Sequence, residues 1–486
     1  MRVRTMNKIR LGKDEYRDRM LGCWLGKNIG GTLGTPVEGQ KFVHSFTYYD
    51  PVPKEPLPND DLDFQLAWLK MLEDRGVNPA FEDFSEYWLK HLSRHWYSEY
   101  SFCTYNLQRG LKPPISGAFQ NYFVDEMGSP IRSEIWACVA PGDPQLAAKM
   151  AWMDSAMDHA GGEGTWGEMF WSAVESAAFV ISDPEVLISV GLSMIPISSH
   201  ISRVIREAVR CRKEGLKWDE ARERIVTIFG HHNACNAIPN HGFTVIGWLY
   251  GKDYGDKICK AVNCGYDTDC TGATLGSLLG IMHGASKIPQ EWKSPIGDAI
   301  TPVKFTVTDG LPLTVGDLAR RTEALAGRFV SQRSKTVEFS DHSDSPVDVL
   351  SLLFNNEGLR SLIGFDSQSS VESVGDFQMA FHYGGEPVLR PGIGRVFGVS
   401  LWRDWEPIDI AEAEIDITVP AGWKLESATQ QANQHRFGVI ANQTGDRNLV
   451  DVTVSIHGVS KRLSFVVLGP DAVRSIPAST SAPRSQ

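Results

Sequence analysis

The feature of this sequence that most constrains its fold is glycine at every fourth position in two distant segments. Glycine costs about 1 kcal/mol relative to alanine inside a helix, so a repeated spacing needs a structural reason. Residues four apart form one ridge of a helix, and a ridge without side chains lets another backbone approach closely. We therefore predict two tightly packed central helices of a bundle, carrying Gly22, Gly26, Gly30 and Gly34 in one and Gly272, Gly276, Gly280 and Gly284 in the other.

The pattern along the chain divides it into a helical part and a β part. From Asp14 to Ala326 apolar residues recur at helical spacing, whereas later runs such as "EAEIDITVPAGW" and "LVDVTVSIHG" are short, β-branched and bounded by turn residues. We predict a multidomain protein, with a large all-α domain followed by a small all-β sandwich. The predicted parts are an N-terminal arm (1–13), the all-α domain (14–328), the sandwich (336–470) and a disordered tail (471–486).

Charge and composition narrow the class of partner. A net charge of -11 argues against binding nucleic acid, and chemistry on a small molecule is the better expectation. The N-terminal segment lacks the apolar run of a secretory signal, and no stretch reaches the roughly 18 apolar residues of a membrane span. We therefore expect a soluble, cytoplasmic protein. Its 8 cysteines show no CxxC zinc spacing, which favours free and mostly buried thiols.

Two acidic motifs stand where helices are predicted to begin. Asp60 and Asp61 lie in "PNDDLDF", and Asp267 and Asp269 lie in "GYDTDCTG" at the start of the second glycine-spaced helix. Each motif alone is explained by the preference of Asp for helix N-termini. Brought together, however, these carboxylates would repel unless a cation lay between them. Oxygen ligands favour a hard ion, so we predict Mg²⁺, with Mn²⁺ or Ca²⁺ as substitutes.

Several segments together resemble a known family. "LGCWLGKNIGGTLGTPVEG", "NDDLDF", "GYDTDCTGATLGSLLG" and "IPQEW" are similar in order and spacing to the ADP-ribosylglycohydrolase family, over about residues 14 to 300. The best-known members remove ADP-ribose from modified proteins. The resemblance implies an all-α fold and a Mg²⁺ site, often binuclear, whose ligands would here be Asp60, Asp61, Asp267 and Asp269.

The resemblance also indicates a catalytic carboxylate and two departures from the family pattern. Glu38 falls where the family carries a glutamate near the scissile bond, a position suited to orienting or deprotonating water. Asn59 and Cys270 stand where the family usually has threonine, so one ion is as compatible with this chain as two. We expect Cys270 to pack. The candidate catalytic residues are Glu38, Asp61 and Asp269, and the candidate metal ligands are Asn59, Asp60, Asp61, Asp267, Asp269 and Thr271.

Polar, glycine-rich segments between the acidic motifs supply candidates for substrate contacts. They include "GSPIRSEIW" and "DHAGGEGTWG", similar to loops that look like substrate walls in the family, and "GHHNACNAIPNHG". For any one of these residues the alternative is a structural polar group with its own partners. The candidate substrate-binding residues are Arg132, Ser133, Glu134, His159, Glu163, Trp166, His232, Asn233 and Asn236.

The sequence leaves the substrate open between two classes. It has no glycine-rich phosphate loop, and its β part is similar to modules that accompany carbohydrate-active enzymes. We expect a Mg²⁺-dependent hydrolase of an N- or O-glycosidic bond to a ribose-like sugar, either ADP-ribosyl or a simpler furanosyl group. The partner would be a small-molecule glycoside or an ADP-ribosylated substrate. A glycosidase for a carbohydrate with no nucleotide, a non-catalytic ADP-ribose or sugar binder, and a structural scaffold are the alternatives.

Overall fold

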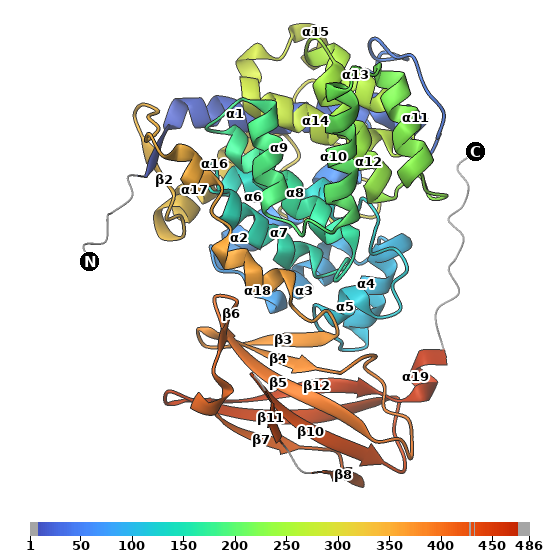
Figure 1. Ribbon diagram of the computed structural model, residues 1–486, viewed down its shortest axis with the longest axis vertical. Helices are drawn as coiled ribbons and strands as arrows, with labels where there is room; N and C mark the ends of the chain where they lie inside the picture. Colours follow the sequence, from blue (N-terminus) through green and yellow to red (C-terminus); the bar gives the residue numbers. More distant parts are fainter. Residues whose placement is uncertain (1–7, 427–428, 432, 475–486) are drawn as a thin grey trace. The chain divides into compact units, whose positions relative to one another are not determined.

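The computed structural model describes residues 8–426, 429–431 and 433–474. The chain forms two compact units, which are each made of several segments (Figure 1). Unit 1 contains the described residues of Met1–Asn78, Asp125–Ser155 and Gly162–Leu359. Unit 2 contains those of Pro79–Val124, Ala156–Gly161 and Arg360–Gln486.

Unit 1 is mainly helical. Its α-helices are α1 (Lys13–Gly34), α2 (Asp60–Arg75), α6 (Ser133–Val139), α7 (Pro144–Ser155), α8 (Glu163–Ala178), α9 (Pro184–Ser193), α10 (His200–Lys213), α11 (Trp218–Phe229), α12 (Ala237–Tyr250), α13 (Tyr254–Asn263), α14 (Thr268–His283), α15 (Gln290–Lys293), α16 (Val315–Gln332) and α17 (Val349–Leu353). Short 3₁₀ turns add η1 (Thr35–Val37), η3 (Pro130–Arg132), η4 (Ala285–Lys287) and η5 (Glu357–Leu359). Two strands, β1 (Ile9–Gly12) and β2 (Val337–Ser340), pair in parallel, so the described end of the predicted N-terminal arm is ordered as a strand.

The two glycine-spaced helices, α1 and α14, pack directly against each other. A Cβ built on Gly26 would lie within 3.0 Å of the carbonyl oxygen of Gly276, and one built on Gly30 would meet that of Gly272. Gly22 faces Gly280 in the same way. Because the residue numbers rise on one helix as they fall on the other, the helices are antiparallel. The predicted close contact of two bare ridges is confirmed.

At the two ends of this helix pair, glycine no longer faces glycine across the contact. Gly284 lies just beyond α14, where its φ of +83° ends the helix and its N–H bonds to the carbonyl of Gly280 at 2.8 Å. At the other end, Gly34 faces the carbonyl of Thr268 in the first turn of α14. The C-terminus of α1 is therefore fixed against the N-terminus of α14, which is where the acidic motif begins.

Unit 2 joins short helices to two antiparallel sheets. The helices are α3 (Phe81–Tyr87), α4 (Ser98–Gln108), α5 (Ile115–Ala118), α18 (Arg360–Ile363) and α19 (Pro470–Arg474), with the π-helix η2 (Trp88–Leu92) and the 3₁₀ turn η6 (Ile410–Glu412). The strands are β3 (Ser369–Val374), β4 (Phe377–His382), β5 (Arg395–Arg403), β6 (Glu406–Ile408), β7 (Glu414–Thr418), β8 (Trp423–Leu425), β9 (Thr429–Gln431), β10 (Gln434–Ala441), β11 (Arg447–Ile456) and β12 (Val459–Leu468). One sheet has the order β3-β4-β5-β10-β8, with β6 beside β5 and β9 beside β10, and the other has the order β12-β11-β7.

The two sheets share one hydrophobic core, as expected of a sandwich. The rings of Phe381 in β4 and Phe465 in β12 stack across it with their centroids 4.9 Å apart. Leu111, Ile115 and Phe119 belong to the same core, although the sequence pattern assigns them to the helical part. The fold class of a helical domain followed by antiparallel sheets is confirmed, while the domain limits stay a prediction.

Three further findings concern the whole described chain. Helix α19 takes up the start of the predicted disordered tail, and residues 475–486 of that tail lie outside the described residues. The eight cysteines, which all lie within the described ranges, form no disulfide. Across the described ranges, no helix has both the length and the apolar character that crossing a bilayer requires.

Candidate functional site

Both acidic motifs and Glu38 meet in unit 1, and we call them together the carboxylate cluster: Glu38, Asp60, Asp61, Asp267 and Asp269. Asp60 and Asp61 begin α2, Asp269 lies in the first turn of α14, and Glu38 follows η1. The charges of Asp267, Asp60 and Asp61 all act on Glu38, and those of Glu38, Asp267 and Asp61 act on Asp269. The structure thus brings the predicted catalytic residues and the predicted aspartate ligands together.

Helix capping does not account for these aspartates. The cap of α2 is Asn59, whose Oδ1 accepts a hydrogen bond from the backbone N–H of Asp61 at 2.7 Å. Asp267 occupies the N-cap position of α14 but makes no side-chain capping hydrogen bond. Its own N–H donates instead to Oδ1 of Asn240, at 3.2 Å. Since Asn59 uses its oxygen as the cap, its predicted role as a metal ligand stays a prediction.

The electrostatics of the cluster favour bound protons or a bound cation. Desolvation raises the pKa of Glu38 to about 8, with Asp267, Asp60 and Asp61 adding to the effect, although the residue as a whole is exposed. Burial, and then the charges of Glu38, Asp267 and Asp61, hold the pKa of Asp269 well above its ordinary value. A cation among these groups would reverse both shifts, because it favours the charged carboxylates.

The donor set fits a divalent cation. Ligand atoms of Asp61, Asp269 and Cys270 lie within 4.8 Å of one another, as do those of Glu38, Asp267 and Cys235. The Oδ1 atom of Asp269 is buried and accepts no hydrogen bond from a described residue. Thr271, the remaining predicted ligand, is buried, and its hydroxyl donates to the carbonyl of Thr268 at 3.2 Å.

A buried lysine forms an ion pair with one aspartate of the cluster. Nζ of Lys27 in α1 lies 3.1 Å from Oδ1 of Asp61 and 2.8 Å from Oε1 of Glu134. Gln65 also donates to Glu134, at 2.9 Å. Burial lowers the pKa of Lys27, but Glu134, Asp61 and Glu175 outweigh it and the pKa is raised, so the ammonium stays charged. Glu134, predicted to contact substrate, thus lies in the protein interior as a partner of Lys27, and sequence reasoning missed Lys27 in this role.

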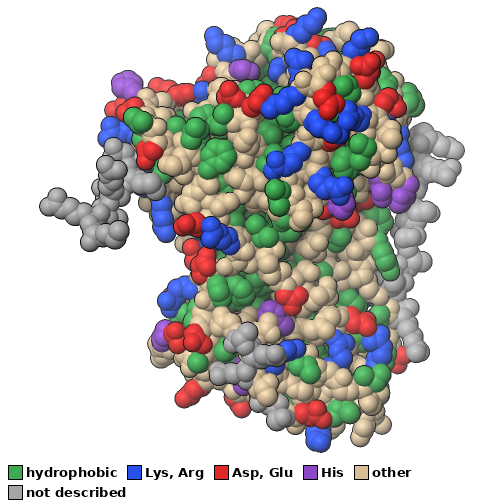
Figure 2. Space-filling view, in the orientation of Figure 1, with side chains coloured by type: hydrophobic (Ala, Val, Ile, Leu, Met, Phe, Trp, Pro, Cys, Tyr) green, Lys and Arg blue, Asp and Glu red, His purple; other side chains and the backbone are tan. Residues whose placement is uncertain are grey.

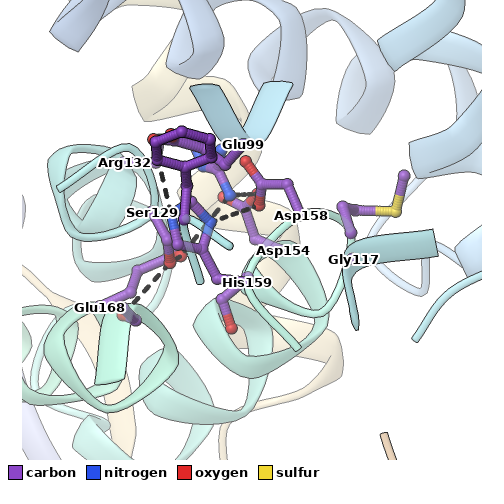
Figure 3. Close-up of polar contacts among 12 residues, drawn as sticks. Glu99, Gly117, Ser129, Arg132, Asp154, Asp158, His159 and Glu168 are labelled. Carbon is purple, nitrogen blue, oxygen red and sulfur yellow. Dashed lines mark hydrogen bonds and ion pairs between the residues drawn. The ribbon is translucent and has the colours of Figure 1, made fainter. Parts of the chain in front are cut away.

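Arg132, a second predicted substrate contact, belongs to a separate buried cluster in unit 1 (Figure 3). Its Nη2 lies 3.0 Å from Oδ1 of Asp154 and 3.9 Å from Oε2 of Glu168. Ser129 donates to Glu168 at 2.5 Å, and the indole N–H of Trp136 donates to Asp154 at 2.9 Å. Arg132 is fully buried, so in this structure it contacts protein groups.

The predicted contact His159 lies in unit 2 and is buried there (Figure 3). Its Nδ1 is 2.9 Å from Oδ1 of Asp158, and its Nε2 is 3.6 Å from Oε1 of Glu99. Burial lowers the pKa of His159, but the two carboxylates outweigh it and raise the pKa to about 9. The imidazolium is therefore held between two acids.

Two further candidates, Glu163 and Trp166, lie in the first turns of α8. Glu163 accepts hydrogen bonds from the backbone N–H groups of His200 and Ile201, both at 2.9 Å, and so satisfies the start of α10. Trp166 is half-buried, and Ser133, which begins α6, is fully buried. The roles of these three residues toward a substrate stay predictions.

The polar run before α12 approaches the carboxylate cluster through Cys235. Asn236 caps α12 by accepting from the N–H of Ile238 at 3.2 Å, and Asn233 accepts from the N–H of Cys235 at 3.2 Å. His232 is exposed, and its carbonyl accepts a hydrogen bond from Lys41. Sequence reasoning placed these residues near the pocket but did not include Cys235, whose signal was its place in this polar run.

A surface hollow of about 450 Å³ lies between α9 and α10 in unit 1. Its lining combines the apolar Ile188 with charged groups that are already paired, Lys213 with Glu185 at 3.1 Å and Arg210 with Glu214 at 3.9 Å. Figure 2 shows acidic and basic side chains interspersed over the helical part of this face. Residues of the carboxylate cluster do not line this hollow.

Comparisons with known proteins show what the chain is similar to. A family model described as ADP-ribosylglycohydrolase matches residues 12–334. An uncharacterized protein of Archaeoglobus fulgidus is 24% identical over 298 residues, covering 58% of this chain and 92% of that protein. A solved structure named "ADP-ribosylglycohydrolase-related protein complex" is 21% identical, with a TM-score of 0.44, over 64% of this chain and 97% of that one.

Proposed function

Because this chain belongs to the ADP-ribosylglycohydrolase family, we propose that it is a Mg²⁺-dependent hydrolase that cleaves an N- or O-glycosidic bond to a ribose-like sugar. The observation that carries the proposal is the convergence of Glu38 with the aspartates of α2 and α14. A buried set of like charges is costly unless a cation or protons neutralise it. Protein oxygens in such numbers suit Mg²⁺.

The aspartates would hold the ion. Asp60, Asp61, Asp267 and Asp269 are the ligands we propose, with Asn59 and Thr271 at the edge of the set. When bound, Mg²⁺ would polarise sugar hydroxyls or lower the pKa of a bound water. Lys27 positions Asp61 by its ion pair at 3.1 Å, and Asn240 positions Asp267 through its backbone N–H at 3.2 Å.

Glu38 is the residue we propose for proton transfer. It lies at the exposed side of the cluster, where a substrate and a water can reach it. Its carboxylate would accept a proton from that water while the new C–O bond forms at the anomeric carbon and the bond to the leaving group breaks. In the metal-free protein the pKa of Glu38 is raised to about 8. A bound cation would lower this pKa, so that the carboxylate is ionised and able to accept the proton at neutral pH.

The substrate class is tested by ligand-induced stabilisation. With Mg²⁺ present, the melting temperature is measured with saturating ADP-ribose and, separately, with ribose, arabinose and galactose. A ligand at about 100 times its Kd adds roughly 2.7 kcal/mol to the free energy of unfolding. We expect ADP-ribose or ribose to raise the melting temperature. A shift with galactose alone would contradict a ribose-like substrate and favour a carbohydrate glycosidase.

Turnover is tested directly on two classes of substrate, ADP-ribosylated peptides and simple furanosides. We expect hydrolysis of one of these classes and its loss when EDTA removes the divalent ion. Full activity in EDTA would overturn the metal-dependent mechanism. Ligand binding with no hydrolysis of either class would instead favour the non-catalytic binder.

A further inference from the structure

Two thiols lie next to the carboxylate cluster, each beside a different pair of its carboxylates. Cys270 lies in the first turn of α14, next to Asp269, and Cys235 lies in the loop before α12. Each thiol forms a group with two carboxylates whose ligand atoms all lie within 4.8 Å of one another. The groups are separate, so sulfur reaches the cluster from two independent segments of the chain.

The group around Cys270 is buried, and its three ligand atoms lie within 4.8 Å of one another. Sγ of Cys270 lies 3.7 Å from Oδ2 of Asp61, and only 7% of the residue is exposed. Asp269 is 5% exposed, and its Oδ1 accepts no hydrogen bond from a described residue. Lys27 pairs with the other oxygen of Asp61, Oδ1. The oxygens of Asp61 and Asp269 nearest the sulfur thus form, with it, a three-atom ligand set.

Backbone contacts hold the second thiol in place. The carbonyl of Cys235 accepts a hydrogen bond from the N–H of Met127 at 2.8 Å, and its N–H donates to Asn233 at 3.2 Å. The next residue but one, Ala237, begins α12. Cys235 is therefore a fixed part of the loop beside Glu38 and Asp267.

We propose that this centre binds borderline divalent ions, of the class of Zn²⁺ and Co²⁺, in preference to Mg²⁺, with Cys270 as the sulfur ligand beside Asp61 and Asp269 and Cys235 as the sulfur ligand beside Glu38 and Asp267. Thiolate sulfur suits such ions, whereas Mg²⁺ requires oxygen ligands in octahedral geometry. On binding, each S–H bond breaks, an S–metal bond forms and the proton leaves to solvent, with no change of oxidation state. This inference rests on the proposed function in placing a cation in the carboxylate cluster, and it replaces Mg²⁺ as the identity of that cation.

The test uses the full chain, freed of metal with a chelator and titrated with Co²⁺. Binding is measured by equilibrium dialysis, and sulfur ligation by the thiolate-to-cobalt charge-transfer absorption in the near ultraviolet. We expect bound Co²⁺ to show this absorption, Zn²⁺ to displace it, and an about 100-fold excess of Mg²⁺ to leave it in place. These measurements use the wild-type protein, so their result does not depend on the folding of any variant.

Matched variants then identify the sulfur atoms. Cys270→Ser and Cys235→Ser replace sulfur by oxygen with little change in size, and Cys259→Ser, in α13, is the control. We expect each site variant to lower the charge-transfer absorption, the double variant to abolish it, and Cys270→Ser to shift the preference at least about tenfold toward Mg²⁺. The control keeps the wild-type absorption.

Two outcomes overturn the inference, and they differ in what else they affect. Co²⁺ that binds without the charge-transfer absorption, or that Mg²⁺ displaces at equal concentration, excludes sulfur ligation and leaves the proposed metal-dependent hydrolase intact. Failure of Co²⁺, Zn²⁺ and Mg²⁺ alike to bind overturns both the inference and the metal site of the proposed function.

Discussion

The two clusters of buried charge in unit 1 are built from the same residue types but balance their charges differently. In the cluster around Arg132, burial and the charge of Asp154 hold the pKa of Glu168 well above its ordinary value, so one cation faces one anion. In the carboxylate cluster, five acidic residues come together. Lys27 pairs with Asp61 and also with Glu134, which lies outside the cluster.

This difference separates a structural cluster from a candidate functional one. Charges that are paired and hydrogen-bonded can be buried permanently, and the Arg132 cluster meets that condition with protein groups. The carboxylate cluster meets it fully only with protons or a cation from outside. Burial of charged residues therefore does not by itself mark a functional site, and the excess of one sign is what supports the proposed cation site in the carboxylate cluster.

The largest expected effect is on turnover. Glu38→Gln should lower kcat/KM by roughly 10²–10⁴-fold, because it removes the proposed proton acceptor and keeps the shape of the side chain. With saturating Mg²⁺ present, the melting temperature should stay close to that of the wild type, since Glu38 is exposed. Kinetics on the best substrate and a thermal melt measure the two quantities. Unchanged kcat/KM would remove Glu38 from the mechanism.

Breaking the balanced cluster should instead affect stability. Arg132→Met leaves Asp154 buried without its cation, which should lower the free energy of unfolding by about 3–5 kcal/mol. Denaturant unfolding measures the loss. Arg132→Lys, which keeps the charge, should lose less. A variant of normal stability whose KM rises strongly would show that Arg132 contacts the substrate after all.

The same substitution, Asp to Asn, should lower the free energy of unfolding of the metal-free protein in the Arg132 cluster but not in the carboxylate cluster. Asp154→Asn removes the anion that balances Arg132 and should destabilise by about 1–3 kcal/mol. Asp269→Asn removes one of several repelling charges, so the free energy of unfolding should stay the same or rise by up to about 1 kcal/mol, while metal affinity falls. Thermal melts with and without the ion measure both. Equal destabilisation by the two substitutions would contradict the comparison.

The last prediction concerns the dependence of stability on pH. The pKa of Glu38 rises from 4.5 to about 8 on folding, so between these values the folded state binds more protons than the unfolded state. The free energy of unfolding of the metal-free protein should therefore fall as pH rises through this range. Glu38→Gln should flatten the slope, and saturating metal should reduce it. An identical slope in the variant would assign it to other groups.

Features that depend on local spacing were predictable from the sequence. The period of four in the glycines of α1 and α14 indicated a close contact of two helices, and the structure has it. The acidic motifs were placed at helix starts because Asp and Asn favour those positions, and Asn59 and Asp267 occupy the two N-caps. Both inferences use physical chemistry that acts within one or two turns of a helix.

Features that depend on distant partners were not predictable. Glu163, a predicted substrate contact, accepts hydrogen bonds from N–H groups at the start of α10, more than 30 positions along the chain, and the local pattern gives no sign of this. Lys27 is not singled out by the sequence, and its burial is explained only by the carboxylates of Glu134 and Asp61 around it. Leu111 and Ile115 have helical neighbours in sequence but join the core of the sandwich. In each case tertiary contacts decide.

The contact between α1 and α14 also bears on how this site tolerates sequence change. Backbone atoms, not side chains, set the separation of the two helices, so the geometry at Gly34 and Thr268 does not depend on how the surrounding core is packed. Core residues elsewhere in unit 1 can therefore be substituted while the geometry of the site is kept. The opposite holds along the ridge, where a single added methyl group at Gly26 or Gly276 has no space and would move both motifs apart.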